Sequence, residues 1–372
     1  MNMTITAITN AAVFDGENTI GIKTVVVEDD LITGLSSSEA STPGGIESIV
    51  DGSGCTLLPG LIDSHAHLYD RVADLETCAK NGVTTLLDMG NRDYRFVDRL
   101  REVPRAASVF SVLGVAYAPG STMLKAMYFP EDCGVKDSVD AIRFVDDQVD
   151  RGADFIKIIL EDPMQNNGIK WPFEVAKALV DRAHEAKKLV IAHAVTPDSY
   201  LEALQFGVDE ISHVPFVPLP QSTLDELIAH KVTIVPTLTM MSTIAQKLNE
   251  SFGIPITADF CFKTVAEFHR AGVNILAGTD ANFDDPPSMA TPMVYGSSLH
   301  RELGYLVQVG LGPREALAAA TSRPADFFGL SDRGRIAVGK RADLYLCKGN
   351  PSEEIADICK AVQVWVAGEE VL

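Results

Sequence analysis

The sequence is poor in basic residues. Its 372 residues include 51 acidic against 31 basic side chains, which gives a formal net charge of −20. Such a chain repels phosphate backbones and anionic lipid surfaces, so we expect neither nucleic acid nor a membrane as a partner. The hydrophobic content of 46% is enough to bury a large core. A small-molecule substrate is therefore the expected ligand.

Paired cysteines and long apolar runs are also missing. The chain has six cysteines, at positions 55, 78, 133, 261, 347 and 359, and none belongs to a Cys-x-x-Cys pair. This spacing fits neither a disulfide framework nor a thiolate zinc site. The segment MNMTITAITNAAVFDG lacks a basic region followed by an apolar stretch, and no apolar run is long enough to cross a bilayer. We therefore expect a cytoplasmic protein with reduced thiols.

Both ends of the chain carry strand and turn signals. Short stretches of alternating apolar and polar residues occur near the start, as in IKTVVVEDDLITGL. The same pattern occurs near the end, in AVQVWVAGEEVL. No helical stretch separates these runs from their neighbours. Residues 1–57 together with 334–372 are therefore predicted to form one β-sandwich domain built from both termini.

Between these ends, a helical stretch repeatedly stops at a glycine or a polar pair, and a β-branched run follows at once. Gly82, Gly152, Gly207 and Gly272 stand where a left-handed helix cap is needed. Short apolar strands that alternate with helices are typical of parallel βαβ units. Eight such strands predict an α/β fold, a (β/α)8 TIM barrel over residues 58–333.

The positions of the eight histidines are the most informative feature of the sequence. His65, His67, His193 and His213 each end a predicted strand. In a barrel, the carboxyl ends of the strands form the functional face. A single such histidine is usually structural, but four imidazoles on one rim indicate a site for zinc, cobalt, nickel or iron. The remaining histidines lie in helical stretches, where a solvated or packing role is expected: His184, His230, His269 and His300.

The spacing of two of these histidines and one further residue, Asp280, support this predicted rim. His65 and His67 are separated by one residue, so on a strand both side chains project from the same side and can share one metal. Asp280 follows the apolar run of the eighth strand in ILAGTDAN. We interpret it as a metal ligand or proton carrier, and the alternative is a helix N-cap.

Lys157 stands inside the otherwise apolar strand ADFIKIIL. A lysine there must reach solvent, pair with an acid or lose its charge, because an unpaired buried ammonium is very costly. The residues alone leave these three alternatives open.

Several segments together resemble the amidohydrolase superfamily, in particular the binuclear members of its prolidase, imidazolonepropionase and ochratoxinase-type groups. They are LLPGLIDSHAHL, GADFIKI, AHA, SHVPF with VPTL, and AGTDA. The resemblance implies two divalent metal ions, with zinc expected first and manganese, cobalt or iron as alternatives. It also implies that Lys157 is carboxylated and, with a hydroxide, bridges the two ions. The other implied ligands are His65, His67 and Asp280 for one ion, and His193 and His213 for the second.

The resemblance implies hydrolysis of an amide-type C–N bond in an N-acyl amino acid, a dipeptide or a cyclic amide. The bridging hydroxide would attack, and Asp280 would carry the proton. The alternatives are a lactonase, a deaminase or a decarboxylase on the same metals, or a non-catalytic scaffold. Deamination ranks low because Lys157 is present and neither 194–196 nor 214–216 supplies the acid that deaminases use.

Substrate choice is expected in the loops that follow the strands. Two departures from the family pattern put the substrate in doubt: Ser212-His213-Val214 replaces Glu-His-Gly, and LEDPMQNNG lacks paired glycines. We expect a homo-oligomer. The candidate substrate contacts are the segment 282–287 and the side chains of Tyr69, Arg71, Tyr117 and Phe216. For Arg71, the alternative is an ion pair within a helix.

Overall fold

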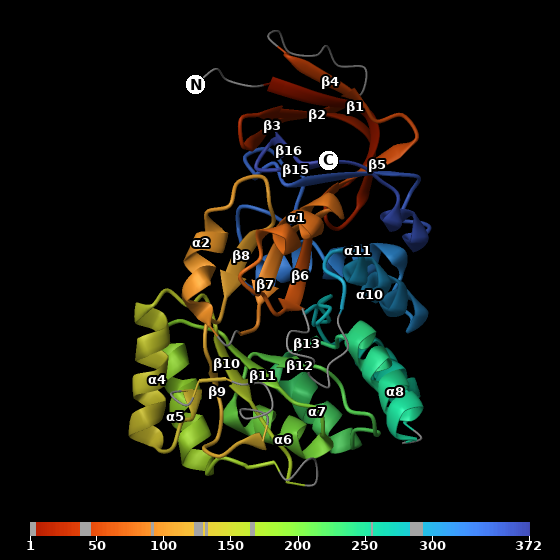
Figure 1. Cartoon of the computed structure of the whole chain (residues 1–372). Helices are drawn as coiled ribbons and strands as arrows, with labels where there is room; N and C mark the ends of the chain where they lie inside the picture. Colours follow the sequence, from red (N-terminus) through yellow and green to blue (C-terminus); the bar gives the residue numbers. More distant parts are fainter. Residues whose placement is uncertain are drawn as a thin grey trace.

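The structure is a computed structural model, shown in Figure 1. It describes residues 5–37, 46–90, 93–122, 129–130, 133–163, 168–253, 256–282 and 293–372.

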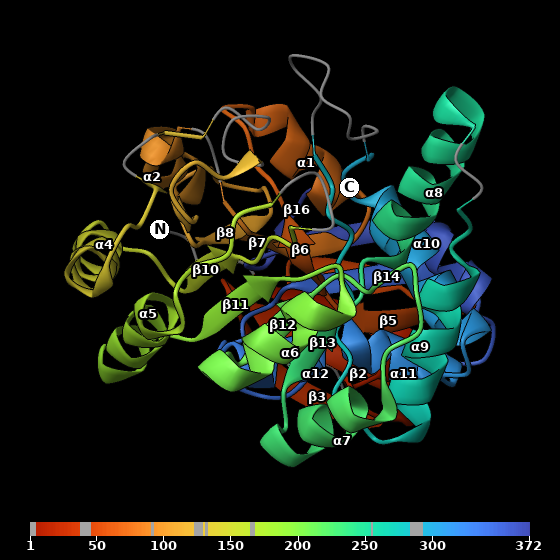
Figure 2. The ribbon, with the colours of Figure 1, turned by 90° about the horizontal axis from the view of Figure 1, so that it is seen from below.

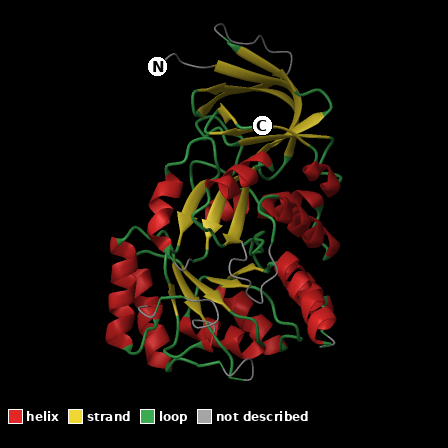
Figure 3. Ribbon diagram, viewed as in Figure 1, coloured by secondary structure: helices red, strands yellow, loops and turns green. Residues whose placement is uncertain are grey.

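Strands from both ends of the chain share one mixed sheet at one end of the molecule (Figures 1 and 3). Its order is β16-β15-β14-β5-β1-β2-β3, and β4 pairs with β1. The two ends meet where β14 runs antiparallel to β5, with Tyr345 opposite Leu58. One sheet therefore joins both termini. The predicted β-sandwich and the predicted domain boundaries at 57/58 and 333/334 stay predictions. The strands are β1 (Ile5–Phe14), β2 (Thr19–Glu28), β3 (Leu31–Ser37), β4 (Ser48–Asp51), β5 (Cys55–Pro59), β14 (Leu344–Lys348), β15 (Ala361–Val366) and β16 (Glu369–Glu370).

The middle of the chain forms two parallel sheets, β6-β7-β8 and β13-β12-β11-β10-β9. Every residue of β6 and β7 is buried, as expected for parallel strands covered on both faces. The third expected strand is divided into β8 and β9. The strands are β6 (Leu61–Ala66), β7 (Val83–Asp88), β8 (Ser108–Ser111), β9 (Val115–Ala116), β10 (Ile156–Ile159), β11 (Val190–His193), β12 (Glu210–Ser212) and β13 (Thr233–Val235).

The eighth expected strand forms isolated bridges in place of a continuous ladder. Parallel bridges join Ile275 to Ile234 of β13 and Ala281 to Ala66 of β6. This segment therefore lies between the two parallel sheets. The arrangement is a TIM-barrel-like α/β fold, and full closure of the barrel stays a prediction.

Helices surround the parallel strands, as Figure 2 shows from below. Among the described residues, no helix is both long and apolar enough to cross a bilayer. The helices are α1 (Val72–Lys80), α2 (Val97–Arg101), α4 (Ser138–Asp150), α5 (Phe173–Glu185), α6 (Pro197–Phe206), α7 (Gln221–His230), α8 (Leu238–Phe252), α9 (Asp259–Arg270), α10 (Ser297–Gln308), α11 (Pro313–Ala319) and α12 (Ser322–Phe327), with 3-10 turns at Tyr94–Phe96 and Ile355–Cys359.

The four glycines predicted as left-handed caps all have positive φ: Gly82 (78°), Gly152 (85°), Gly207 (83°) and Gly272 (75°). This prediction is confirmed, and the cap explains how each helix reverses directly into the next strand.

Gly82 has a second role, because it lies where the barrel-like part meets the mixed sheet. A Cβ at Gly82 would lie 2.6 Å from the ring of Tyr345 on β14. The ring of Tyr345 also contacts His300 of α10, and the two rings stack with an interplanar angle of 8°. His300 Nε2 lies 2.8 Å from the carbonyl oxygen of Asn81. The turn after α1 thus packs directly against both neighbours.

This contact predicts an unequal cost for two glycine substitutions. Gly272→Ala should lower the free energy of unfolding by about 1–2 kcal/mol, because only the left-handed backbone is strained and nothing lies within 4 Å of the new Cβ. Gly82→Ala should cost about 1–3 kcal/mol more, because the ring of Tyr345 must move. Denaturant unfolding of both variants measures the difference, and equal costs would show that the Gly82 contact is unimportant.

Candidate metal centre

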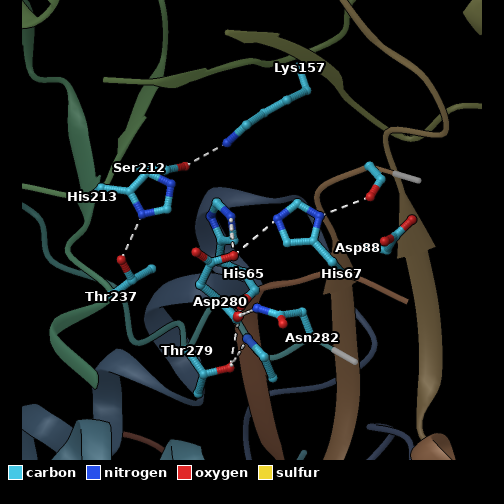
Figure 4. A network of polar contacts seen from close by, with 12 residues as sticks. His65, His67, Asp88, Lys157, Ser212, His213, Thr237, Thr279, Asp280 and Asn282 are labelled. Carbon is cyan, nitrogen blue, oxygen red and sulfur yellow. Dashed lines mark hydrogen bonds and ion pairs between the residues drawn. The ribbon is translucent and has the colours of Figure 1, made fainter. Parts of the chain in front are cut away.

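Figure 4 shows most of the residues expected on the rim close together, among them His65, His213 and Asp280. His65 lies within β6 and His67 directly follows it. Asp280 Oδ1 lies 3.0 Å from His67 Nε2 and 3.6 Å from His65 Nε2. The His-x-His pair and the end of the eighth segment therefore face one another, as the strand positions predicted.

The two later histidines complete the cluster. His193 is the last residue of β11, and His213 directly follows β12. Their ring centroids are 4.5 Å apart, and the centroid of His213 is 5.0 Å from that of His65. His65, His213 and Asp280 offer ligand atoms that all lie within 4.8 Å of one another.

Lys157 points into the same cluster from β10. Its side chain is 1% exposed, and its Nζ donates to Ser212 Oγ at 2.9 Å. Burial lowers the pKa of Lys157, and the carboxylates of Glu210 and Asp280 oppose that change. Of the three alternatives for this lysine, the structure excludes access to solvent. It brings all six predicted residues together.

His65 provides the test of whether these residues suit a metal ion. Both of its ring nitrogens are buried and have no hydrogen-bond partner among the described residues. Burial also lowers the pKa of His65 and His213 well below the usual value, and that of His193 to about 3, so these imidazoles are neutral. A neutral imidazole with an unused nitrogen is the form that a divalent ion binds. The donor set therefore fits a metal centre.

Hydrogen bonds orient two of the other rings. His67 Nδ1 lies 2.9 Å from the carbonyl oxygen of Gly90, and since a carbonyl only accepts, this nitrogen carries the proton. His213 Nδ1 lies 2.8 Å from Thr237 Oγ1. Each contact leaves Nε2 for a metal. Burial alone would lower the pKa of His67, but the bond to Asp280 raises it.

Asp63 holds two parts of the centre together. Its Oδ1 accepts from the backbone N–H groups of His65 and Thr279, at 3.2 and 3.1 Å, and its Oδ2 accepts from Thr279 Oγ1 at 2.7 Å. Gly278 permits the close approach, because a Cβ there would lie 2.9 Å from His65 N. This buried carboxylate thus fixes Asp280 relative to the first strand.

The backbone at the rim is strained. His213, Thr237 and Asp280 all have positive φ, at 74°, 47° and 57°. Such angles are uncommon outside glycine and persist where surrounding contacts impose them. Two buried tyrosines supply such contacts. The hydroxyl of Tyr200 donates to the carbonyl of the strained His213 at 2.5 Å. That of Tyr295 donates to the carbonyl of His67 at 2.6 Å and holds the neighbouring part of the rim.

The candidate substrate contacts are placed less clearly. Arg71 forms an ion pair with Asp74 at 3.3 Å, which confirms the helical alternative. Tyr117 is 2% exposed and packs in the core, with its ring beside Phe129. Phe216 is partly buried against the main core.

Tyr69 is partly buried. Asn282 donates to the carbonyl of Asp280 at 2.9 Å, and residues 283–287 lie outside the described residues. Substrate binding by all of these residues stays a prediction.

Sequence reasoning missed Glu210. It is fully buried on β12, and its Oε1 accepts from Ser212 Oγ at 2.8 Å. Burial raises the pKa of Glu210, and the nearby Lys157 opposes that change. The available signal was the alternation in DEISHV, which places Glu210 and Ser212 on the same face of the strand.

Comparison with known proteins identifies the family. The amidohydrolase family matches residues 56–371. The chain belongs to the amidohydrolase family. It is accordingly a hydrolase.

Individual relatives agree with this assignment. This amidohydrolase is 25% identical over 349 residues to the enamidase of Eubacterium barkeri, covering 87% of this chain and 80% of the relative. It is 38% identical over 94 residues to an imidazolonepropionase of Ruegeria sp., covering 25% and 21% of the two chains. A solved structure of a Xaa-Pro dipeptidase superposes with a TM-score of 0.85 at 20% identity, over 99% of both chains, which shows the same fold.

The contact between His213 and Thr237 predicts an effect on metal affinity. Thr237→Val should weaken zinc binding by about 10–100-fold, because the ring of His213 loses the hydroxyl that orients it. Thr243→Val on α8 is the matched control, since Thr243 Oγ1 donates to the carbonyl of Thr239 within the same helix. Zinc competition with a chelating dye measures both, and equal affinity in the two variants would contradict the prediction.

Proposed function

We propose that this amidohydrolase cleaves an amide-type C–N bond of a small molecule at a centre for two divalent metal ions. The observation that carries the proposal concerns His65. Neither of its buried ring nitrogens has a hydrogen-bond partner among the described residues, although the candidate ligands His67, His213 and Asp280 lie beside the ring. Leaving buried polar atoms unpaired is costly, so a missing bonding partner is implied.

The proposed ligand sets are those that the resemblance to the amidohydrolase superfamily implies. Imidazole and carboxylate donors suit zinc, with manganese, cobalt or iron as alternatives. His65, His67 and Asp280 would hold one ion, His193 and His213 the other, and Lys157 would lie between them. When bound, the ions supply Lewis acidity, which lowers the pKa of water and polarises a carbonyl group.

Lys157 is proposed to act as a carboxylate after addition of carbon dioxide. Only a neutral amine adds carbon dioxide, and burial favours the neutral form of Lys157. A carboxylated lysine is an anion, which suits a place between two cations better than an ammonium group would.

Asp280 is proposed to move the proton. Its carboxylate is 15% exposed and faces His65 and His67 at the open end of the strands. It can accept a proton from water and deliver it to the leaving nitrogen of the substrate. The left-handed backbone at Asp280 and the bonds from Asp63 to Thr279 hold that carboxylate in place.

The substrate class is inferred from the relatives and the departures noted in the sequence. The enamidase acts, by its name, on an amide, and the same class of bond is proposed here. We propose an N-acyl amino acid, a dipeptide or a cyclic amide as substrate. Metal analysis of the purified protein, combined with a screen of these compounds, tests the assignment. The screen includes lactones and adenine as substrates for the alternative lactonase and deaminase activities. Fewer than one ion per chain with bicarbonate present, together with no hydrolysis of any amide, would overturn it.

Lys157→Ala is predicted to abolish most of the activity. We expect a loss on the order of 10²–10³-fold or more, because the anion between the ions is removed. Short carboxylic acids should restore part of the activity by occupying the vacated space. The control is Lys177→Ala, a lysine on α5 that pairs with Asp181 on the surface. Unchanged turnover in Lys157→Ala would show that the site assignment is wrong.

A further inference from the structure

Three buried polar side chains form a hydrogen-bonded chain beneath the metal centre. Lys157 Nζ donates to Ser212 Oγ at 2.9 Å, and Ser212 Oγ donates to Glu210 Oε1 at 2.8 Å. Lys157 is 1% exposed, and the other two are fully buried. Figure 4 shows the lysine extended toward Ser212, beside His213.

The strand register explains how these groups meet. Lys157 of β10 lies opposite Ile191 of β11, and Ile191 lies opposite Glu210 of β12. Lys157 and Glu210 therefore start from the same level of the parallel strands. Ser212 stands two residues further along β12, on the same face as Glu210 and one level closer to the histidines. The long lysine side chain must rise toward the rim to reach it.

The direction of the hydrogen bonds is fixed by chemistry. A serine hydroxyl has one proton to donate and two lone pairs. Because Glu210 accepts that proton, Ser212 can only accept from Lys157. Glu210 thus determines which way the hydroxyl faces.

Glu210 has no other evident use for its carboxylate. Its Oε2 is buried and has no hydrogen-bond partner in the described residues. A half-satisfied buried carboxylate is destabilising unless a nearby cationic group or hydrogen bond compensates it. The hydrogen bond that Glu210 accepts from Ser212 supplies that compensation on its other oxygen.

We propose that Glu210 is a positioning residue, which acts through Ser212 to hold the nitrogen of Lys157 in the metal centre. This inference rests on the proposed function, in which Lys157 is carboxylated. When the neutral amine adds carbon dioxide, a new N–C bond forms, one proton leaves the nitrogen to solvent, and one N–H remains. That remaining N–H donates to Ser212, which turns the new carboxylate away from Ser212 and toward the histidines.

The test compares variants of the chain with the wild-type holoenzyme. Zinc content is measured as a function of bicarbonate, and the lysine carboxylate is detected by NMR after loading with ¹³C-labelled bicarbonate. For Ser212→Ala we expect the bicarbonate required for half-maximal loading of the second zinc ion to rise by about tenfold or more, with loss of the labelled signal. Glu210→Gln should shift loading in the same direction, because it removes the charge and allows the amide to present a donor to Ser212.

Two controls separate positioning from general damage. Ser212→Thr keeps the hydroxyl and should load zinc like the wild type. Ile191→Val removes one methylene at the same level of the strands and should also leave loading unchanged. Thermal unfolding of each apo variant establishes that it is folded, and Glu210→Gln serves as the test if Ser212→Ala is not.

The outcomes distinguish the two proposals. If the wild type takes up no second zinc ion and gives no labelled lysine, the proposed function fails and the positioning role fails with it. If the wild type behaves as proposed but Ser212→Ala and Glu210→Gln load zinc at the same bicarbonate concentration as Ile191→Val, only the positioning role is overturned.

Discussion

The constraint on which the site depends is the removal of ionisable groups from water at the carboxyl ends of parallel strands. Lys157, His65 and His213 are all almost fully buried there. Burial penalises their charged forms, so it lowers the pKa of both imidazoles well below the usual value and also lowers the pKa of Lys157. Among the described residues, neither ring nitrogen of His65 has a hydrogen-bond partner, and a neutral imidazole with an unused nitrogen is the form that a divalent ion binds. The same burial that destabilises the empty arrangement therefore suits it to a metal ion.

Such a centre needs a rigid frame, and much of that frame comes from groups that are not ligands. Glu302 of α10 accepts from the backbone N–H groups of Leu238 and Thr239, at 2.9 and 2.7 Å. These two N–H groups begin α8, directly after Thr237, which contacts His213. Glu302 of α10, outside the strands, therefore fixes the strained turn at Thr237, and Thr237 in turn orients the ring of His213. Asp63 on β6 likewise fixes the backbone beside Asp280 through its hydrogen bonds from Thr279. The positive φ angles are therefore imposed from several elements at once.

The sequence predicts some parts of this structure better than others, for physical reasons. Strand positions and glycine caps are local properties, so the alternation of helices and parallel strands follows from the chain. The rim histidines follow too, because the ends of parallel strands share one edge. Asp63 and Glu210 could not be placed that way, because their roles depend on which strands are neighbours and in what register. Lys157 lies between these cases, since its place in an apolar strand was evident but the choice among solvent access, an acidic partner and loss of charge was not.

The departure at Ser212 illustrates why register matters. The resemblance to the family sets a glutamate directly before the histidine, and this chain has a serine there. The structure shows that an acid is nevertheless present on the same face of β12, two residues earlier at Glu210. Because side chains on one strand face repeat every second residue, the carboxylate is moved one level away from the ligands, and a hydroxyl connects it to Lys157. The strand thus keeps an acid near Lys157 while leaving only a small side chain beside His213. Glu210 and Ser212 therefore act together on the lysine.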